Sequence, residues 1–220
     1  MTRCVVEAQK IGGGLTNLDV PAAPEAGLQF IPSSLHCRLR DATAAVHERM
    51  HGHDAFCAVK DGLIGKAAYM QLLCRLYGFY KPFERETGLA DARSRWLAQD
   101  LDALGLDLSL REKILDCAYI PPMHTPYRRL GALYVVAGSA LGGRQLARCL
   151  DHLFPYDKTA GRLFFLGHGA KTGVVWRDYL EQLAAVPPDP YTHAEIVDAA
   201  IDTFAVFERW ASGWKDAAHG

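Results

Sequence analysis

The chain has 220 residues, half of them hydrophobic, and its formal net charge at pH 7 is −1. This length and composition predict one domain with one sizeable hydrophobic core. The near-zero charge argues against a nucleic-acid-binding or membrane-surface protein, because such proteins concentrate basic side chains on one face. No apolar run reaches the ~18–20 residues that span a bilayer, and the N-terminus lacks a signal-peptide pattern. We therefore expect a soluble protein that is not exported.

Six cysteines are scattered along the chain without the paired spacing of a metal site or a disulfide framework. They are Cys4, Cys37, Cys57, Cys74, Cys117 and Cys149. Free thiols persist in reducing compartments, so this usage favours a cytoplasmic protein.

Residues 1–30 contain Gly12–Gly14 and the stretch Pro21–Gly27, without any sustained period. They predict a flexible N-terminal arm, followed by one helical domain over residues 31–220. Beyond the arm, apolar residues recur at intervals of three or four, which is the spacing of one helix face. This periodicity predicts helices over residues 34–51, 65–87 and 91–104.

The pattern Ser109–Glu112 is a capping box, and it predicts a helix that ends before Pro121. A glycine-bearing helix is expected over 127–153, and another over 158–184 with an interruption near Gly167 and Gly169.

A second capping box, Thr192–Glu195, is expected to open the last helix, whose apolar residues continue to Trp214. No segment shows the period of two that indicates a strand. The predicted class is therefore all-α, with several helices around one core.

The segment 131–143 carries four glycines, Gly131, Gly138, Gly142 and Gly143, in an otherwise apolar helical pattern. Each glycine inside a helix costs roughly 1 kcal/mol relative to alanine. Missing side chains allow a close approach, either by another helix or by a planar ligand lying across the backbone. In both cases a bend in the helix is expected, since clustered Gly and Ser residues are a known cause of kinks.

Residues 47–51, His-Glu-Arg-Met-His, match the H-E-x-x-H pattern of zinc peptidases. A hydrolytic zinc site needs a third protein ligand, however, and no Asp, Glu or His lies between Gly62 and Pro82. The alternatives are that His47 alone is a ligand or that it is a core histidine. Arg40 lies seven residues earlier, about 10 Å along the same helix face, where it could meet anionic groups of a ligand held by His47.

Two segments together resemble the signature segments of the heme oxygenase family: LRDATAAVH at 39–47 and GALYVVAGSALGG at 131–143. Their order and separation also fit, and a weaker likeness extends over about residues 33–215. The likeness is closest to bacterial members, including those that accompany bacteriophytochromes. It implies a single-domain, all-α fold with heme between the first helix and the glycine-rich helix. It also implies oxidative cleavage of heme to biliverdin, ferrous iron and carbon monoxide, with heme as both substrate and cofactor.

The resemblance assigns roles by position. His47 matches the proximal iron ligand, and Arg40, Thr43 and Tyr134 are expected to contribute to heme binding, with Arg40 and Tyr134 at a propionate. The segment above the iron is matched by Gly138, Ser139, Gly142 and Gly143. Two positions depart from common patterns: Ser139 replaces the aspartate of mammalian-type enzymes, and Ala137 replaces a glutamate common in bacterial relatives.

Electrons are expected from a separate reductase or ferredoxin, because the chain has no G-x-G-x-x-G nucleotide-binding motif. A bacteriophytochrome is a candidate acceptor for biliverdin. Two other functions stay open from the sequence. The chain could be a heme carrier or sensor without turnover, or an enzyme of the same architecture that acts on another substrate and uses its glycines only for helix packing.

Overall fold

The computed structural model describes residues 34–89, 93–154 and 159–214, and within these ranges it has helices and no strand. The all-α prediction is therefore confirmed. The described helices belong to one compact unit, Pro32–Gly220. The predicted arm, residues 1–30, lies outside the described residues.

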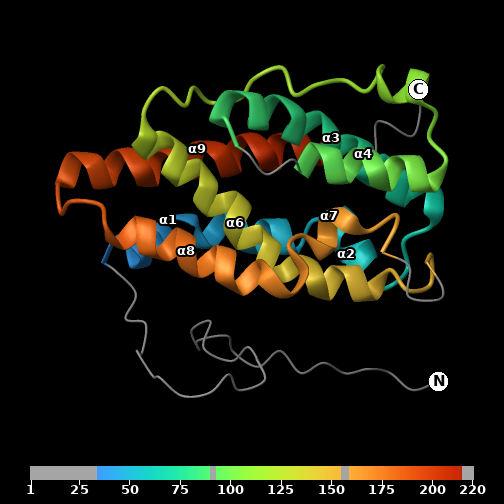
Figure 1. Cartoon of the computed structure of the whole chain (residues 1–220), viewed down its shortest axis with the longest axis horizontal. Helices are drawn as coiled ribbons and strands as arrows, with labels where there is room; N and C mark the ends of the chain where they lie inside the picture. Colours follow the sequence, from blue (N-terminus) through green and yellow to red (C-terminus); the bar gives the residue numbers. More distant parts are fainter. Residues whose placement is uncertain (1–33, 90–92, 155–158, 215–220) are drawn as a thin grey trace, which may run out of the picture. The chain divides into compact units, whose positions relative to one another are not determined.

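Most connections between the helices are short, whereas longer segments separate α5 from α6 and α6 from α7 (Figure 1). In chain order they are α1 (Ser34–His51), α2 (Asp54–Lys60), α3 (Lys66–Thr87), α4 (Arg93–Leu104), α5 (Leu108–Arg111), α6 (Pro126–Cys149), α7 (Leu163–Leu166), a 3-10 turn η1 (Gly169–Lys171), α8 (Thr172–Ala184) and α9 (Pro190–Ser212). The predicted interruption of 158–184 is confirmed, because Gly167 and Gly169 both have positive φ angles between α7 and α8.

Helix α9 is central to the packing, since it contacts α1, α3 and α6. Helix α3 packs on α4 and supplies the largest buried aromatic side chains, Tyr69, Phe79 and Phe83. Helix α6 begins at Pro126 behind the N-cap Thr125, whose side chain accepts a hydrogen bond from the Arg128 amide. Figure 1 shows α6 changing direction along its length, as expected for a helix with clustered glycines.

The second predicted capping box is wrong. Helix α9 begins at Pro190, where Asp189 is the N-cap and accepts from the Thr192 amide at 2.7 Å. Glu195 does not turn back on its own helix, because its carboxylate accepts a hydrogen bond from the Thr125 hydroxyl at 2.5 Å. This bond joins the N-cap of α6 to the second turn of α9.

The first predicted capping box is also wrong, because Ser109 lies inside the four-residue helix α5, whose N-cap position is Asp107. The longer helix expected up to Pro121 is therefore wrong. The chain beyond α5 instead runs against α3, where the Cys117 amide donates to the Gly78 carbonyl at 2.7 Å. A Cβ on Gly78 would lie only 2.2 Å from the Leu115 carbonyl oxygen. Close backbone contact with α3 thus replaces the local helix.

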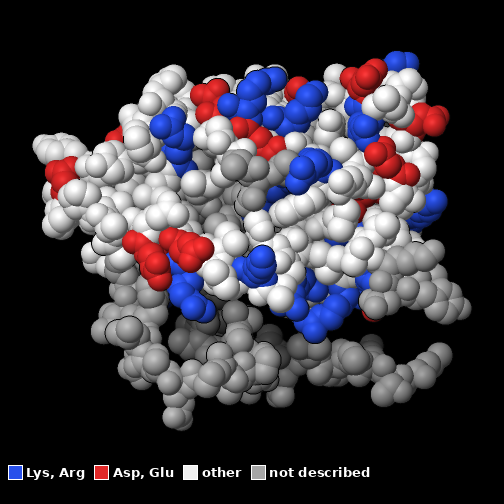
Figure 2. Space-filling view, viewed as in Figure 1, with Lys and Arg blue, Asp and Glu red and all other residues white. Residues whose placement is uncertain are grey.

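Charged side chains of both signs are interspersed on the face shown in Figure 2, in keeping with the formal net charge of −1. Among the described residues, none of the helices combines the length and the apolar character that crossing a membrane requires.

Candidate functional site

Two of the four α6 glycines are packed tightly against neighbouring backbone. A Cβ on Gly131 would lie 2.1 Å from the carbonyl oxygen of Ile196 in α9, and one on Gly143 would lie 2.6 Å from the carbonyl oxygen of Phe165 in α7. Both glycines are buried. These two positions lack a side chain because helices approach there.

The other two glycines have room around them. A Cβ on Gly138 would meet only the Trp176 ring, at 3.8 Å, which is an ordinary contact. A Cβ on Gly142 would have no atom within 4 Å, and Gly142 is exposed. The backbone of α6 is therefore bare at these positions without any protein contact that requires it.

Helix α1 carries Arg40, Thr43 and His47 at intervals of three and four residues, so the three lie along one side of it. Arg40 is exposed and pairs with its neighbour Asp41 at 3.1 Å. Thr43 is buried, and its hydroxyl donates to the Leu39 carbonyl at 2.8 Å.

The His47 ring is exposed and lies 6.5 Å from the Phe204 ring of α9, edge to face. Desolvation, together with the neighbouring His51, lowers the pKa of His47, while Glu48 opposes this shift. The imidazole is consequently neutral near pH 7, which is the form that coordinates a metal.

Tyr134 of α6 connects the two helices. Burial raises the pKa of Tyr134, and a hydrogen bond with the Thr43 side chain and the charge of Arg40 oppose that rise. Three of the predicted residues are thus brought together. His47 of α1 and Gly138 of α6 each follow this contact by one helical turn, four residues after Thr43 and Tyr134 respectively.

An aromatic cluster that the sequence did not reveal lies beside Tyr134. Trp176 of α8 is 6.0 Å from the Tyr134 ring and 5.9 Å from the ring of His36, which is buried in α1. Trp176 also stacks on Tyr179 at 5.4 Å. The only sequence signal was the helical spacing of these residues, which does not indicate the helix that they face.

Ser139 has a partner that sequence reasoning also missed. Its hydroxyl donates to the Val136 carbonyl at 2.9 Å. Burial raises the pKa of Tyr80 in α3, while the nearby Arg93 guanidinium and a hydrogen bond with Ser139 oppose that rise. Tyr80 and Arg93 are both buried, with 4% of each exposed. A buried phenol thus reaches the exposed hydroxyl beside Gly138.

Asp100 of α4 fixes the start of α7. Its fully buried carboxylate accepts hydrogen bonds from the amides of Leu163 and Phe164 at 2.7 and 2.8 Å. Desolvation raises the pKa of Asp100 to about 6, although these amide donors oppose the shift. The carbonyl of Phe165 in α7 contacts Gly143 of α6. By fixing the start of α7, Asp100 therefore also supports this part of α6.

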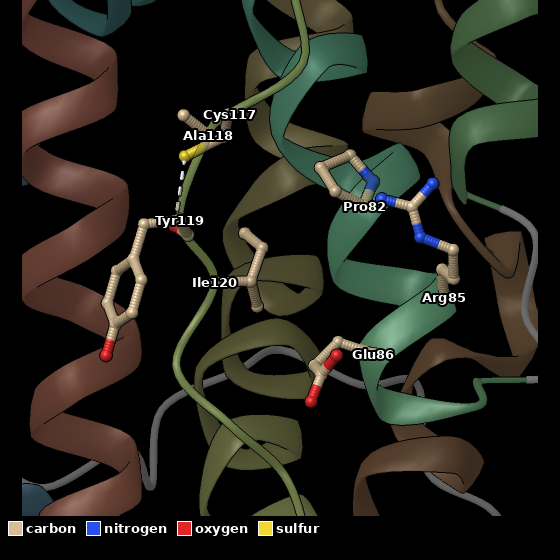
Figure 3. Close-up of a pocket in the computed structure, with 7 residues that line it drawn as sticks. All are labelled: Pro82, Arg85, Glu86, Cys117, Ala118, Tyr119 and Ile120. Atoms are coloured by element: carbon tan, nitrogen blue, oxygen red, sulfur yellow. Dashed lines mark hydrogen bonds between the residues drawn. The ribbon is translucent and has the colours of Figure 1, made fainter.

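A shallow pocket of about 250 Å³ lies elsewhere, between α3 and the segment after α5 (Figure 3). It is smaller than the roughly 300–1,000 Å³ of typical ligand pockets, and no predicted site residue lines it. Its lining consists of Pro82, Arg85, Glu86, Cys117, Ala118, Tyr119 and Ile120. Within the described residues, no three His, Cys, Asp or Glu side chains are grouped to hold a metal ion.

The donor set fits a heme. A neutral, exposed imidazole can serve as an axial iron ligand, and the uncovered backbone at Gly138 and Gly142 offers a surface for a planar macrocycle. Arg40 supplies a cation for carboxylates, whereas the Thr43 hydroxyl donates to the Leu39 carbonyl and the Tyr134 hydroxyl is hydrogen-bonded with Thr43.

Comparison with known proteins agrees with this geometry. Residues 33–212 match the heme oxygenase family. A heme oxygenase from Xanthomonas campestris pv. campestris (strain 8004) is 31% identical over 156 residues, which cover 68% of this chain and 92% of that protein.

Solved structures show the same fold at lower identity. Heme oxygenase-1 from Synechocystis sp. PCC6803, in complex with heme, has a TM-score of 0.66 at 20% identity, covering 84% of this chain and 96% of its own. The heme oxygenase from Leptospira interrogans has a TM-score of 0.66 at 16% identity, covering 82% and 99%. With the family match covering most of its length, the chain belongs to the heme oxygenase family.

Proposed function

We propose that the protein cleaves heme oxidatively to biliverdin, ferrous iron and carbon monoxide, with O2 and external electrons. Two observations carry this proposal: the exposed imidazole of His47 on α1, and the uncovered α6 backbone at Gly138 and Gly142. Membership of the family supports the same conclusion.

In this proposal His47 holds the iron from the α1 side. Arg40 would neutralise a propionate, and the Tyr134 hydroxyl, which is hydrogen-bonded with Thr43 here, would turn to that propionate when heme binds. When bound, heme itself supplies the capacity to accept electrons and activate O2.

The distal side is assigned to α6. Gly138 and Gly142 let the macrocycle approach the helix closely, which side chains would prevent. The Ser139 hydroxyl donates to the Val136 carbonyl and is hydrogen-bonded with Tyr80, so these two partners would orient it beside a bound heme. Gly143 supports this segment from behind through its contact with Phe165.

The proposal includes partners that the family and the sequence favour. A separate reductase or ferredoxin supplies the electrons, and a bacteriophytochrome is one acceptor for biliverdin. The proposal puts this chemistry in the cytoplasm, which the scattered, unpaired spacing of the cysteines supports.

The test is a hemin titration of purified protein, followed by ascorbate or a ferredoxin system in air with catalase present. A histidine-ligated Soret band that decays into the broad red absorption of biliverdin supports the enzyme. A stable Soret band under both reductants would indicate a heme carrier or sensor instead.

The ligand assignment is tested with His47→Ala, which is expected to lose or strongly alter the Soret band. His124→Ala is the matched control, because His124 is also exposed but lies outside the site. A spectrum that is unchanged by His47→Ala would contradict the proposed iron ligand.

A further inference from the structure

The two histidines of the H-E-x-x-H pattern lie close together although they do not form a peptidase site. The ring centres of His47 and His51 are 4.4 Å apart and the ring planes are inclined by 72°. Both side chains are exposed at the C-terminal end of α1. The Nδ1 of His53 accepts a hydrogen bond from the Ala55 amide at the start of α2, so this nitrogen is already engaged.

The ring separation indicates which metals suit the pair. At metal–nitrogen distances of ~2.0–2.1 Å, two imidazole ring centres lie about 4.5 Å apart for a right angle at the metal and about 5.2 Å apart for a tetrahedral angle. The separation of 4.4 Å fits the right angle. Right angles between ligands occur in tetragonal sites, which Ni2+ and Cu2+ favour, whereas Zn2+ favours tetrahedral sites.

The surroundings of the pair do not oppose a cation. Arg49, the nearest cation along the helix, is paired with Glu208 of α9 at 2.5 Å. The ring of α9 that faces His47 is the apolar Phe204. The carboxylate of Glu48 lies between the two histidines in sequence and is exposed.

We propose that, in the heme-free protein, His47 and His51 chelate one divalent transition metal ion of the Ni2+ or Cu2+ type, with water completing its coordination. Such an ion and heme would exclude each other, because both require His47. The metal-binding part of this inference depends only on the geometry of α1. The mutual exclusion of the metal ion and heme rests on the proposed function.

The experiment uses the full-length, tag-free, heme-free protein and Ni2+ as the probe, because Ni2+ does not readily oxidise the thiols. Calorimetric titration in a non-coordinating buffer compares wild type with His51→Ala, and His124→Ala is the matched exposed-histidine control. We expect one Ni2+ per wild-type chain, at least tenfold weaker binding by His51→Ala, and binding within twofold of wild type for His124→Ala. Equal Ni2+ affinity of His51→Ala and wild type would overturn the proposal.

A second titration separates this inference from the proposed function. Hemin is added to wild type and to His51→Ala, each with and without saturating Ni2+, and the Soret band is recorded. We expect Ni2+ to weaken hemin binding at least tenfold in wild type and less than twofold in His51→Ala. If Ni2+ binds through His51 but leaves the hemin affinity of wild type unchanged, the exclusion and the role of His47 as iron ligand fail, and the metal site stands.

Discussion

Gly131 and Gly138 lie seven residues apart on nearly the same face of α6, about two turns or 10 Å along the helix, yet their surroundings differ. At Gly131 the face is pressed against α9, with the Ile196 carbonyl where a side chain would be. At Gly138 and Gly142 the same face has only the Trp176 ring or no protein atom nearby. One face of one helix therefore serves packing at its first turns and stays open further along.

This difference shows that glycine in a helix does not identify a ligand site by itself. Its meaning depends on what occupies the missing side chain's position. Where protein backbone does so, substitution is expected to cost stability. Where no protein atom occupies that position, glycine lowers the stability of the helix and allows no closer packing in exchange. Such a glycine therefore points to a role in binding.

The largest expected effect is that of Gly131→Ala. The added Cβ would lie 2.1 Å from the Ile196 carbonyl oxygen and 3.0 Å from the Ala199 Cβ, so α6 and α9 would have to separate. Overpacking of this kind is expected to lower the free energy of unfolding by about 3 kcal/mol. Urea denaturation followed by circular dichroism measures it, and an unchanged midpoint would contradict the division between the two kinds of glycine.

Asp100→Asn tests whether the Asp100 carboxylate fixes the start of α7, the helix that contacts Gly143. The amide offers one acceptor oxygen to the two amides of α7, so one of them loses its partner, and we expect a cost of about 1–3 kcal/mol. The cost depends on pH. Because the pKa of Asp100 is raised to about 6, the folded state holds the proton more tightly than the unfolded state, and the resulting stability is lost as the pH rises from about 4 through 6.

Denaturation of both proteins between pH 4 and 7 measures this dependence. The stability advantage of wild type over Asp100→Asn should be greatest near pH 4 and should shrink as the pH rises. An advantage that grows with pH would show that Asp100 is stabilised as a carboxylate in the folded protein.

Tyr80→Phe tests the part of α6 around Gly138 and Ser139, where the helix is not covered by protein backbone. It removes the phenol that hydrogen-bonds Ser139 and keeps the ring, so the expected loss is about 1 kcal/mol of stability. Hemin affinity should be retained and the rate of hemin turnover should fall. Hemin titration and single-turnover assays of the variant measure these two quantities separately. A parallel fall in hemin affinity and turnover rate would mean that Tyr80 only supports the fold.

The smallest expected effect has the opposite sign. Gly142→Ala meets no atom within 4 Å, so the variant should gain roughly 0.5–1 kcal/mol from the better helix propensity of alanine. The same Cβ would project toward the proposed macrocycle and should weaken hemin binding or slow turnover. A variant that is both more stable and fully active would remove Gly142 from the proposed site.

The fold was largely predictable because long amphipathic helices carry a strong periodic signal. The bounds of α1 and α3 follow from it, as does the place of α6. Helix α2 was missed because its seven residues are too few to show a period. The start of α9 was misassigned because Glu195 bonds to Thr125, in a distant part of the chain, in place of its own first turn.

The candidate site was predictable only in its residue types. The pattern of glycines indicated a close approach, but which glycine is covered depends on where α9 and α7 pass. The link from Tyr80 to Ser139 joins α3 to α6, and no local spacing encodes it. The roles of His47, Arg40 and the α6 segment stay predictions until the hemin titrations are made.

The position of α9 has a consequence for biosynthesis. Helix α9 packs on both α1 and α6, yet it follows both of them along the chain. As the chain emerges from the ribosome, the two helices that flank the candidate site exist well before the helix that supports them. If heme binds between these helices as proposed, a nascent chain would lack the packed site until α9 has been synthesised, and heme binding would follow completion of α9.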